Sequence, residues 1–231
     1  MSEKKHFVVF SHGFGVRYDD RGLFTDIADG LGDDMEPILF DYNDYDEEKN
    51  ELTVHPFSEQ SSILRRKVEE VREGGSDAII DLVAHSQGCT ITALTVIPGI
   101  RRAILISPPI EVSKLNTIKR TKSRPGAHID LEGISRLPRT DGSVTIVPAA
   151  YWKERVSMDP KPLYKRLARD VEATVIRAES DQIVGNAPFD FLDDEEARII
   201  SLPGDHDFSG DDREGLVETV VNLLLESTNR E

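Results

Sequence analysis

Short apolar runs that alternate with amphipathic stretches constrain the fold of this chain more than any other feature. Runs such as 6–11 (HFVVFS) and 102–107 (RAILIS) are apolar over most of their length, which is typical of strands buried on both faces of a parallel sheet. The runs expected to form strands are 6–11, 36–42, 78–84, 102–107, 172–178 and 197–202. The alternation predicts an α/β fold, with a mostly parallel sheet of about six strands and helices on both faces.

Amphipathic segments fill the intervals between these runs. Residues 58–73 carry apolar side chains at helical spacing, with Ser58 expected as the N-cap and Gly74–Gly75 as the stop. The expected helices are 21–31, 58–73, 87–97 and 211–227. The acidic stretch 41–51 (DYNDYDEEKNE) is expected to be an exposed loop.

A region rich in proline and basic residues interrupts the rhythm at 108–169. Within it, Asp141–Gly142 lies between alternating residues, which is a hairpin signal. We therefore expect an α/β core over 1–107 and 170–231, with 108–169 as a small insert or lid between the fourth and fifth strands. The insert contains the basic residues Lys114, Lys119, Arg120, Lys122, Arg124, Arg136 and Arg139. Two interpretations stay open for them, a solvated flap and a site that attracts acidic substrates.

Composition limits the classes of partner and the location. The chain has 43 acidic and 28 basic residues and a formal charge of −15, which disfavours nucleic-acid binding. No apolar run approaches the roughly 18 residues of a membrane span. In the opening MSEKKHFVVFSHG, the apolar run before Ser11 is too short for the apolar region of a secretory signal. We expect a cytoplasmic protein whose oligomeric state, monomer or dimer, stays open. The single cysteine, Cys89, excludes an intramolecular disulfide.

The stretch DLVAHSQGCT (81–90) places one serine where a buried strand gives way to a helix. Ser86 is flanked two places away by Ala84 and Gly88. A serine on a sharp strand-to-helix turn needs small residues at these positions, because the strand and helix backbones nearly touch there. Ser86 is therefore a candidate nucleophile, and the alternative is that it only caps the helix.

Two later loops supply the partners that a serine nucleophile needs. A serine hydroxyl requires a base to take its proton, and the base requires an acid to fix its tautomer. Asp181 follows the fifth strand in RAESDQIVG, and His206 follows the sixth in LPGDHDFSG. Each of these residues alone is compatible with an ordinary loop, but their order, Ser86 then Asp181 then His206, is the order expected on a mostly parallel sheet.

Further residues are expected to contact a substrate. Backbone amides that stabilise a developing oxyanion are expected from Gln87, at the start of the helix after the serine, and from Phe14, in the loop after the first strand. The aromatic residues Tyr151, Trp152 and Tyr164 of the insert either line a substrate pocket or hold the insert against the core. Both alternatives stay open.

Four motifs together resemble the α/β-hydrolase superfamily: HGFG, VAHSQG, SDQIV and GDHDF. Within that superfamily the chain is most similar to small carboxylesterases, which include cinnamoyl and feruloyl esterases. One departure is Ala84, which stands where the usual G-x-S-x-G motif has its first glycine.

The resemblance implies the roles of the three polar residues. Ser86 is then the nucleophile, His206 the general base and Asp181 the acid that orients it. The implied activity is hydrolysis of a small-molecule carboxylic ester through an acyl-enzyme, with no metal or organic cofactor. A thioesterase, peptidase or acyltransferase would use the same three residues, and a non-catalytic ligand-binding protein of this fold is a further alternative.

Overall fold

The computed structural model describes residues 4–74, 77–111, 125–185, 188–192 and 196–226. Six strands form the main sheet in the order β10-β9-β6-β5-β1-β2, and every neighbouring pair is parallel. They are β1 (His6–Ser11), β2 (Met35–Ile38), β5 (Ile79–His85), β6 (Arg102–Ile106), β9 (Glu172–Ala178) and β10 (Ala197–Leu202). The predicted fold class, a parallel sheet of about six strands, is confirmed.

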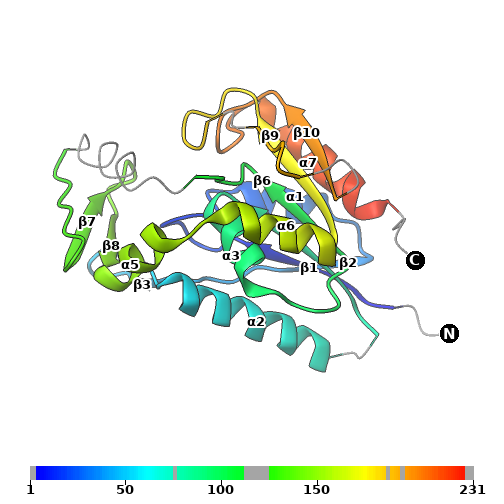
Figure 1. Ribbon diagram of the computed structural model, residues 1–231, viewed down its shortest axis with the longest axis horizontal. Helices are drawn as coiled ribbons and strands as arrows, with labels where there is room; N and C mark the ends of the chain where they lie inside the picture. The colour runs from blue at the N-terminus through cyan, green and yellow to red at the C-terminus, as the bar shows by residue number, and fades with distance from the viewer. Residues whose placement is uncertain (1–3, 75–76, 112–124, 186–187, 193–195, 227–231) are drawn as a thin grey trace.

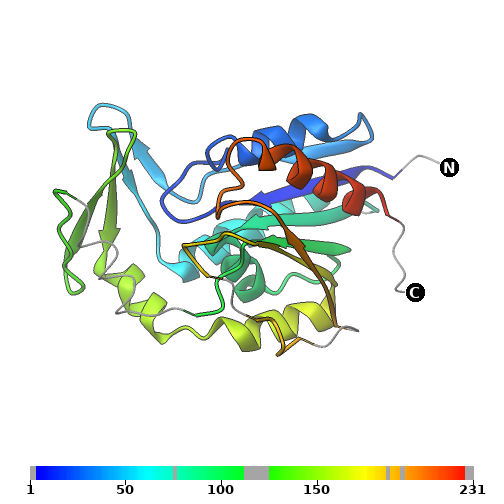
Figure 2. The same ribbon diagram turned by 90° about the horizontal axis from the view of Figure 1, so that it is seen from above.

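Helices cover both faces of this sheet (Figures 1 and 2). The helices α1 (Leu23–Gly30) and α7 (Asp212–Leu225) lie on one face, and α2 (Phe57–Glu73), α3 (Gln87–Thr95) and α6 (Pro160–Asp170) lie on the other. Because successive strand residues point to opposite faces, Val8 and Phe10 pack with α1 and α7, while Phe7 and Val9 pack with α2. No helix in the described part of the chain combines the length and the apolar character that crossing a bilayer requires.

A second, smaller sheet lies at the end of the molecule opposite both chain termini (Figure 1). Its strands, in the order β3-β4-β8-β7, are β3 (Asp44–Asp46), β4 (Glu51–Thr53), β8 (Val144–Pro148) and β7 (Ile134–Pro138). The pairs β3–β4 and β7–β8 are antiparallel hairpins, and β4 pairs with β8 in parallel. The helix α5 (Ala149–Ser157) follows β8 directly.

Three local expectations are wrong. The stretch 41–51, expected as an exposed loop, contains β3 and the start of β4, because β8 supplies a pairing partner far away in the sequence. Ser58 is not the N-cap of α2: the helix already begins at Phe57, and the Ser58 amide donates to Glu154. The helices α5 and α6 were not expected, although Asp159 and Pro160 form a normal helix start, with the Asp159 carboxylate accepting from the Lys161 amide.

Some expectations fall outside the described residues. They are Gly75 and five of the seven basic residues between Lys114 and Arg139, namely Lys114, Lys119, Arg120, Lys122 and Arg124. Within 108–169, the described helix α6 packs on α3 and on β9 of the main sheet.

The strand order reverses at β1, between β2 on one side and β5 on the other. The chain passes from β1 outward to β2, and later strands build on the other side of β1, starting with β5. In open α/β sheets, ligands bind where the strand order reverses in this way. The loop after β1 and the turn after β5 therefore meet at the place where a site is expected.

Candidate active site

Ser86 occupies a strained turn between β5 and α3. Its backbone angles, φ 52° and ψ −121°, lie in a region that non-glycine residues rarely adopt, and its amide is held by the carbonyl of Ile106 at 2.9 Å. Such a conformation costs about 1–3 kcal/mol and persists only when the surroundings enforce it. The Ser86 side chain makes no capping hydrogen bond to α3. The alternative that this serine only caps the helix is therefore wrong.

A glycine two residues later allows the turn to close. A Cβ on Gly88 would overlap the carbonyl oxygen of Ser11 and would lie 2.8 Å from the carbonyl oxygen of His12. The Ser11 hydroxyl also donates to the Gly88 carbonyl at 2.9 Å. The end of β1 thus lies directly against the start of α3, and Ala84, on the other side of the serine, is fully buried. The small residues around Ser86 reflect this close approach of two backbones.

Ser86, His206 and Asp181 form a continuous series of hydrogen bonds. The Nε2 atom of His206 lies 2.8 Å from Ser86 Oγ, and its Nδ1 atom lies 2.8 Å from Asp181 Oδ2. Because a carboxylate only accepts, Nδ1 carries the proton and Nε2 presents its lone pair to the serine hydroxyl. Three residues that lie far apart in the sequence are thus brought together in an arrangement that is chemically able to remove a proton from an alcohol.

The surroundings of Asp181 keep it ionised. Burial raises the pKa of Asp181, but the His206 hydrogen bond and the amides of Ile183 and Val184 outweigh burial and lower that pKa below its ordinary value. Both amides donate to Oδ1, at 2.8 and 2.9 Å, so Oδ2 is left for the histidine. The carboxylate is therefore fixed in position and charge next to the imidazole.

The amides of Phe14 and Gln87 are free to bind an anion. No acceptor within the described residues takes a hydrogen bond from either N–H group. Gln87 is the first residue of α3, where helix amides lack intrahelical partners. The loop that carries Phe14 comes close to the serine, since a Cβ on Gly13 would lie 3.4 Å from the Cβ of Ser86. We call residues 12–15 the oxyanion loop.

His12 fixes the course of the oxyanion loop. Its Nε2 atom accepts from the Tyr42 amide at 3.0 Å, so its Nδ1 carries the proton and donates to the Gly13 carbonyl at 3.0 Å. Burial lowers the pKa of His12 and outweighs the nearby carboxylates, so the ring is neutral. This histidine supports the loop backbone and does not face Ser86.

A buried pair that no sequence pattern indicated, Asp20 and His85, contacts the oxyanion loop and the backbone of His206. Asp20 Oδ2 lies 2.8 Å from His85 Nδ1 and also accepts from the Gly13 amide at 2.8 Å. His85 Nε2 lies 3.0 Å from the carbonyl oxygen of His206, which Ser107 Oγ approaches at 3.2 Å. The available signal was a histidine directly before the candidate nucleophile, with aspartates in the loop after β1.

His85, His206 and Asp207 also form a cluster of metal-ligand types whose donor atoms lie within 4.8 Å of one another. All four ring nitrogens of the two histidines already take part in hydrogen bonds within the chain. Neither imidazole therefore offers a free lone pair to an ion in this arrangement.

The three aromatic residues of the insert are buried and hydrogen-bonded. Tyr151 donates to Gln87 Oε1, Trp152 Nε1 donates to Ser135 Oγ at 3.0 Å, and the Tyr164 hydroxyl donates to the Pro109 carbonyl at 3.1 Å. None of the three lines the cavity described next. Their packing corresponds to the alternative in which they hold the insert against the core, and a substrate pocket formed by them stays a prediction.

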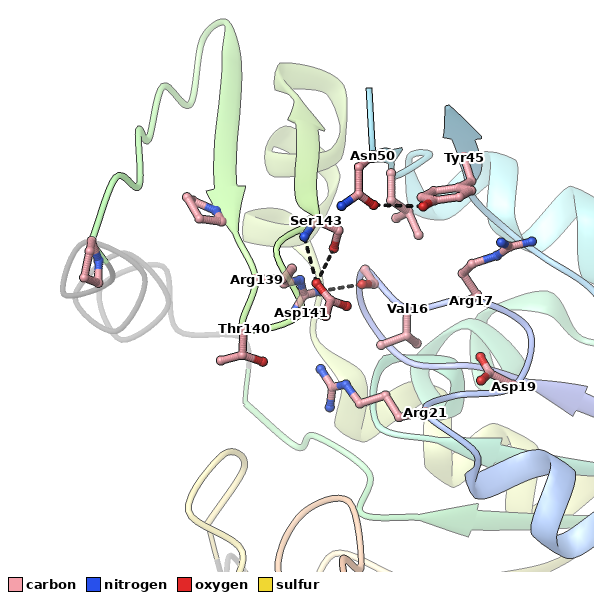
Figure 3. A pocket seen from close by; sticks show the side chains of 14 residues that line it. Val16, Arg17, Asp19, Arg21, Tyr45, Asn50, Arg139, Thr140, Asp141 and Ser143 are labelled. Atoms are coloured by element: carbon pink, nitrogen blue, oxygen red, sulfur yellow. Dashed lines mark hydrogen bonds between the residues drawn. The ribbon is translucent and has the colours of Figure 1, made fainter. Parts of the chain in front are cut away.

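A cavity of about 690 Å³ lies beside the oxyanion loop (Figure 3). Its wall includes the loop after β1, the β3–β4 hairpin and the turn between β7 and β8. In Figure 3, Arg17 and Asp19 lie on one side and Thr140 and Asp141 on the other. The lining residues are Gly15, Val16, Arg17, Asp19, Arg21, Tyr45, Asn50, Leu52, Pro125, Pro138, Arg139, Thr140, Asp141 and Ser143. The volume is that of a small-molecule site.

Arg139 joins the insert to the oxyanion loop. Its Nη2 group donates to the carbonyl oxygens of Phe14 and Gly15 at 2.9 and 2.6 Å, and its guanidinium lies 5.6 Å from the centre of the Phe14 ring. Gly15 has a φ of 62°, and a side chain there would collide with this guanidinium. The second glycine of HGFG therefore makes room for a residue of the insert.

A parallel six-stranded sheet with a serine on the turn after β5, and an acid and a histidine after β9 and β10, defines the α/β-hydrolase fold. Neither a protein-family model nor a curated protein matches the sequence. Solved structures do match the fold. The ferulic-acid complex of Est1E from Butyrivibrio proteoclasticus is 18% identical, with a TM-score of 0.69 over 96% of this chain and 89% of that one.

Two further solved structures agree over nearly their whole length. The monoacylglycerol lipase of Paleococcus ferrophilus is 16% identical, with a TM-score of 0.66 over 94% of this chain and 93% of that one. A lipase-esterase related protein from Clostridium acetobutylicum is 14% identical, with a TM-score of 0.63 over 95% of both chains. At these identities the likeness establishes the fold.

Proposed function

We propose that the protein hydrolyses carboxylic esters through an acyl-enzyme on Ser86. The observation that carries this proposal is the unbroken hydrogen-bond series from Ser86 through His206 to Asp181, with 2.8 Å at each step. The strained backbone of Ser86 supports it, because strain of this kind gathers at functional sites. Esterases and lipases among the similar structures favour an ester over a thioester or a peptide as the substrate.

In the first half of the proposed reaction, Ser86 Oγ attacks the ester carbonyl carbon and His206 Nε2 takes the hydroxyl proton. The new Oγ–C bond converts the carbonyl oxygen into an oxyanion, which accepts hydrogen bonds from the Phe14 and Gln87 amides. Asp181 stabilises the imidazolium that forms. When the tetrahedral intermediate collapses, the bond to the alcohol breaks and His206 gives its proton to the departing oxygen.

In the second half, water replaces the alcohol. His206 removes a proton from the water as its oxygen attacks the acyl carbon, and the oxyanion forms again against the same two amides. Collapse breaks the bond to Ser86 Oγ, which recovers the proton from His206. The products are a carboxylic acid and the original enzyme. This sequence needs only the three side chains and the two amides.

The direct test compares Ser86→Ala with the unaltered protein on p-nitrophenyl acetate and butyrate. We expect kcat to fall by about 10⁴-fold or more, as in other serine knockouts. Ser62→Ala is the matched control, since Ser62 is exposed on α2, and it should retain full turnover. A fluorophosphonate probe should label the unaltered protein and not Ser86→Ala. Turnover that survives the loss of Ser86 would refute the proposal.

We further propose that the cavity beside the oxyanion loop receives part of the substrate. Thr140→Trp would fill the cavity from its exposed rim and is expected to raise KM for bulky esters several-fold, with little effect on acetate. The control is Ile134→Trp, at an exposed position on β7 outside the cavity lining. Equal effects of the two tryptophans would contradict this use of the cavity.

A further inference from the structure

The pair formed by Asp20 and His85 connects three separate parts of the site. Asp20 binds the Gly13 amide of the oxyanion loop, and His85 is the residue directly before Ser86. On its other side, His85 binds the backbone carbonyl of His206. Asp20 and His85 are 3% and 2% exposed, so water does not compete for these bonds. None of the steps of the proposed reaction uses the pair as an acid, a base or a nucleophile.

The hydrogen-bond geometry defines the charge of His85. A backbone carbonyl oxygen only accepts, so Nε2 must carry a proton to bind the carbonyl of His206. Asp20 Oδ2 also accepts from the Gly13 amide, which favours the ionised carboxylate, and a carboxylate at Nδ1 is an acceptor too. With acceptors at both nitrogens, the ring is satisfied only as an imidazolium, and Asp20 is its carboxylate counter-ion.

The charged groups around His85 agree with this state. Burial lowers the pKa of His85, but the Asp20 carboxylate outweighs burial and raises that pKa above its ordinary value, with a smaller contribution from Asp207. Burial likewise raises the pKa of Asp20, but the charge and the hydrogen bond of His85, together with the Gly13 amide, outweigh burial and lower it below its ordinary value. Among the described residues the His206 ring also lies beside His85, with the two ring centres 5.0 Å apart.

Two residues that contact the same connection have a positive φ. Asp20 has a φ of 45°, and Ser107, which shares the His206 carbonyl with His85, has a φ of 48°. Non-glycine residues adopt such angles only when neighbouring contacts enforce them. Two of the residues that hold the His85 connection in place therefore have a backbone conformation that their contacts must enforce.

We propose that the buried Asp20–His85 ion pair positions the groups that react at Ser86. The pair holds the oxyanion loop and the His206 loop at a fixed separation. The role rests on the proposed function, because it serves the same serine. The ion pair itself touches neither the substrate nor the reacting atoms. A shift of about 1 Å between groups held in this way can reduce the rate by about 100-fold.

The first experiment measures the charge of His85 and needs no activity. Ring ¹⁵N and ¹H NMR of the unaltered protein at pH 8 should show His85 with both nitrogens protonated, whereas an exposed histidine is neutral there. The exposed His128 is the internal reference. In Asp20→Asn, His85 should lose one ring proton at the same pH. A neutral His85 in the unaltered protein would overturn the proposal, whatever the enzyme does.

The second experiment separates positioning from stability. Asp20→Asn is expected to lower kcat by about 10- to 100-fold, with KM nearly unchanged because the pair does not touch substrate. The concentration of active sites is measured by fluorophosphonate labelling of Ser86, so that kcat is calculated for folded protein only. Asp20→Glu, which keeps the carboxylate, should recover part of the loss. Asp29→Asn, an exposed neighbour on α1 with the same change in charge, should have no effect.

The outcomes distinguish this inference from the proposed function. An unaltered protein without esterase activity would refute the proposed function and the positioning role together. An active protein in which folded Asp20→Asn retains full kcat would refute the positioning role alone. If Asp20→Asn does not fold, the NMR result on the unaltered protein still decides whether the ion pair exists, and Asp20→Glu supplies the kinetic test.

Discussion

Replacing Gly88 with alanine tests whether backbone contact holds the Ser86 turn in place. The new Cβ would overlap the Ser11 carbonyl oxygen and would lie 2.6 Å from the Ser11 carbonyl carbon, where real Cβ contacts stay beyond 3.0 Å. These are backbone atoms of β1, so no side-chain rotation relieves the collision. The end of β1 and the start of α3 must instead separate, by about 1 Å, within a tightly packed interior.

Two measurable losses follow from Gly88→Ala. Overpacking of this kind costs about 1–3 kcal/mol of unfolding free energy. A displacement of about 1 Å between Ser86 and the oxyanion loop should also lower kcat by about 100-fold. Urea unfolding measures the first loss, and p-nitrophenyl acetate turnover by the folded protein measures the second.

Gly215→Ala is the matched control for this experiment. Gly215 lies within α7, and a Cβ there meets nothing within 4 Å. The same substitution should therefore raise the unfolding free energy by about 0.5–1 kcal/mol, because alanine favours the helix, and leave kcat unchanged. If Gly88→Ala is as stable and as active as the unaltered protein, the backbone contact does not hold the nucleophile.

Three further substitutions test other contacts. Tyr151→Phe removes the hydroxyl that binds the buried Gln87 side chain and should cost roughly 1–3 kcal/mol in urea unfolding; a raised KM without this loss would favour a substrate contact instead. Arg139→Gln releases two carbonyls of the oxyanion loop and should lower kcat about 10-fold in ester assays. Burial raises the pKa of Asp81, but the Arg101 and His6 contacts lower it overall. The stabilisation by the Asp81 carboxylate is therefore present at neutral pH and is lost below about pH 4. In urea unfolding, the stability that Asp81→Asn loses relative to the unaltered protein should be smaller in acid than at neutral pH.

Most of the main sheet was predictable from the sequence, because its strands carry a local signal. Buried parallel strands are short apolar runs, and each was recognisable without knowledge of its neighbours. The small sheet had no such signal. β4 has three residues and pairs with β8, about 90 residues away, so only tertiary contact defines it as a strand. The start of α6 was different, since Asp159 and Pro160 were a local signal that the irregular composition of the insert obscured.

The residues of the candidate site also divide into those that the sequence could predict and those that it could not. Ser86, Asp181 and His206 were predictable because each follows a strand, and the carboxyl ends of parallel strands share one edge of the sheet. The Asp20–His85 pair was not, because a histidine and an aspartate 65 residues apart show no periodicity or spacing that joins them. Roles that arise from a shared strand edge can be inferred from order along the chain, whereas roles that arise from burial require coordinates.

The contacts of the insert indicate that it braces the site in addition to bordering it. Arg139 binds the carbonyls of Phe14 and Gly15, while the Tyr151 ring lies 5.3 Å from the Phe14 ring and its hydroxyl binds the side chain of Gln87. In the proposed reaction, Phe14 and Gln87 are the residues whose amides bind the oxyanion. A lid that only admits substrate affects KM, but an insert that supports both amides affects the stability of the oxyanion. Loss of the Arg139 contacts should therefore appear first in the kcat of the proposed reaction.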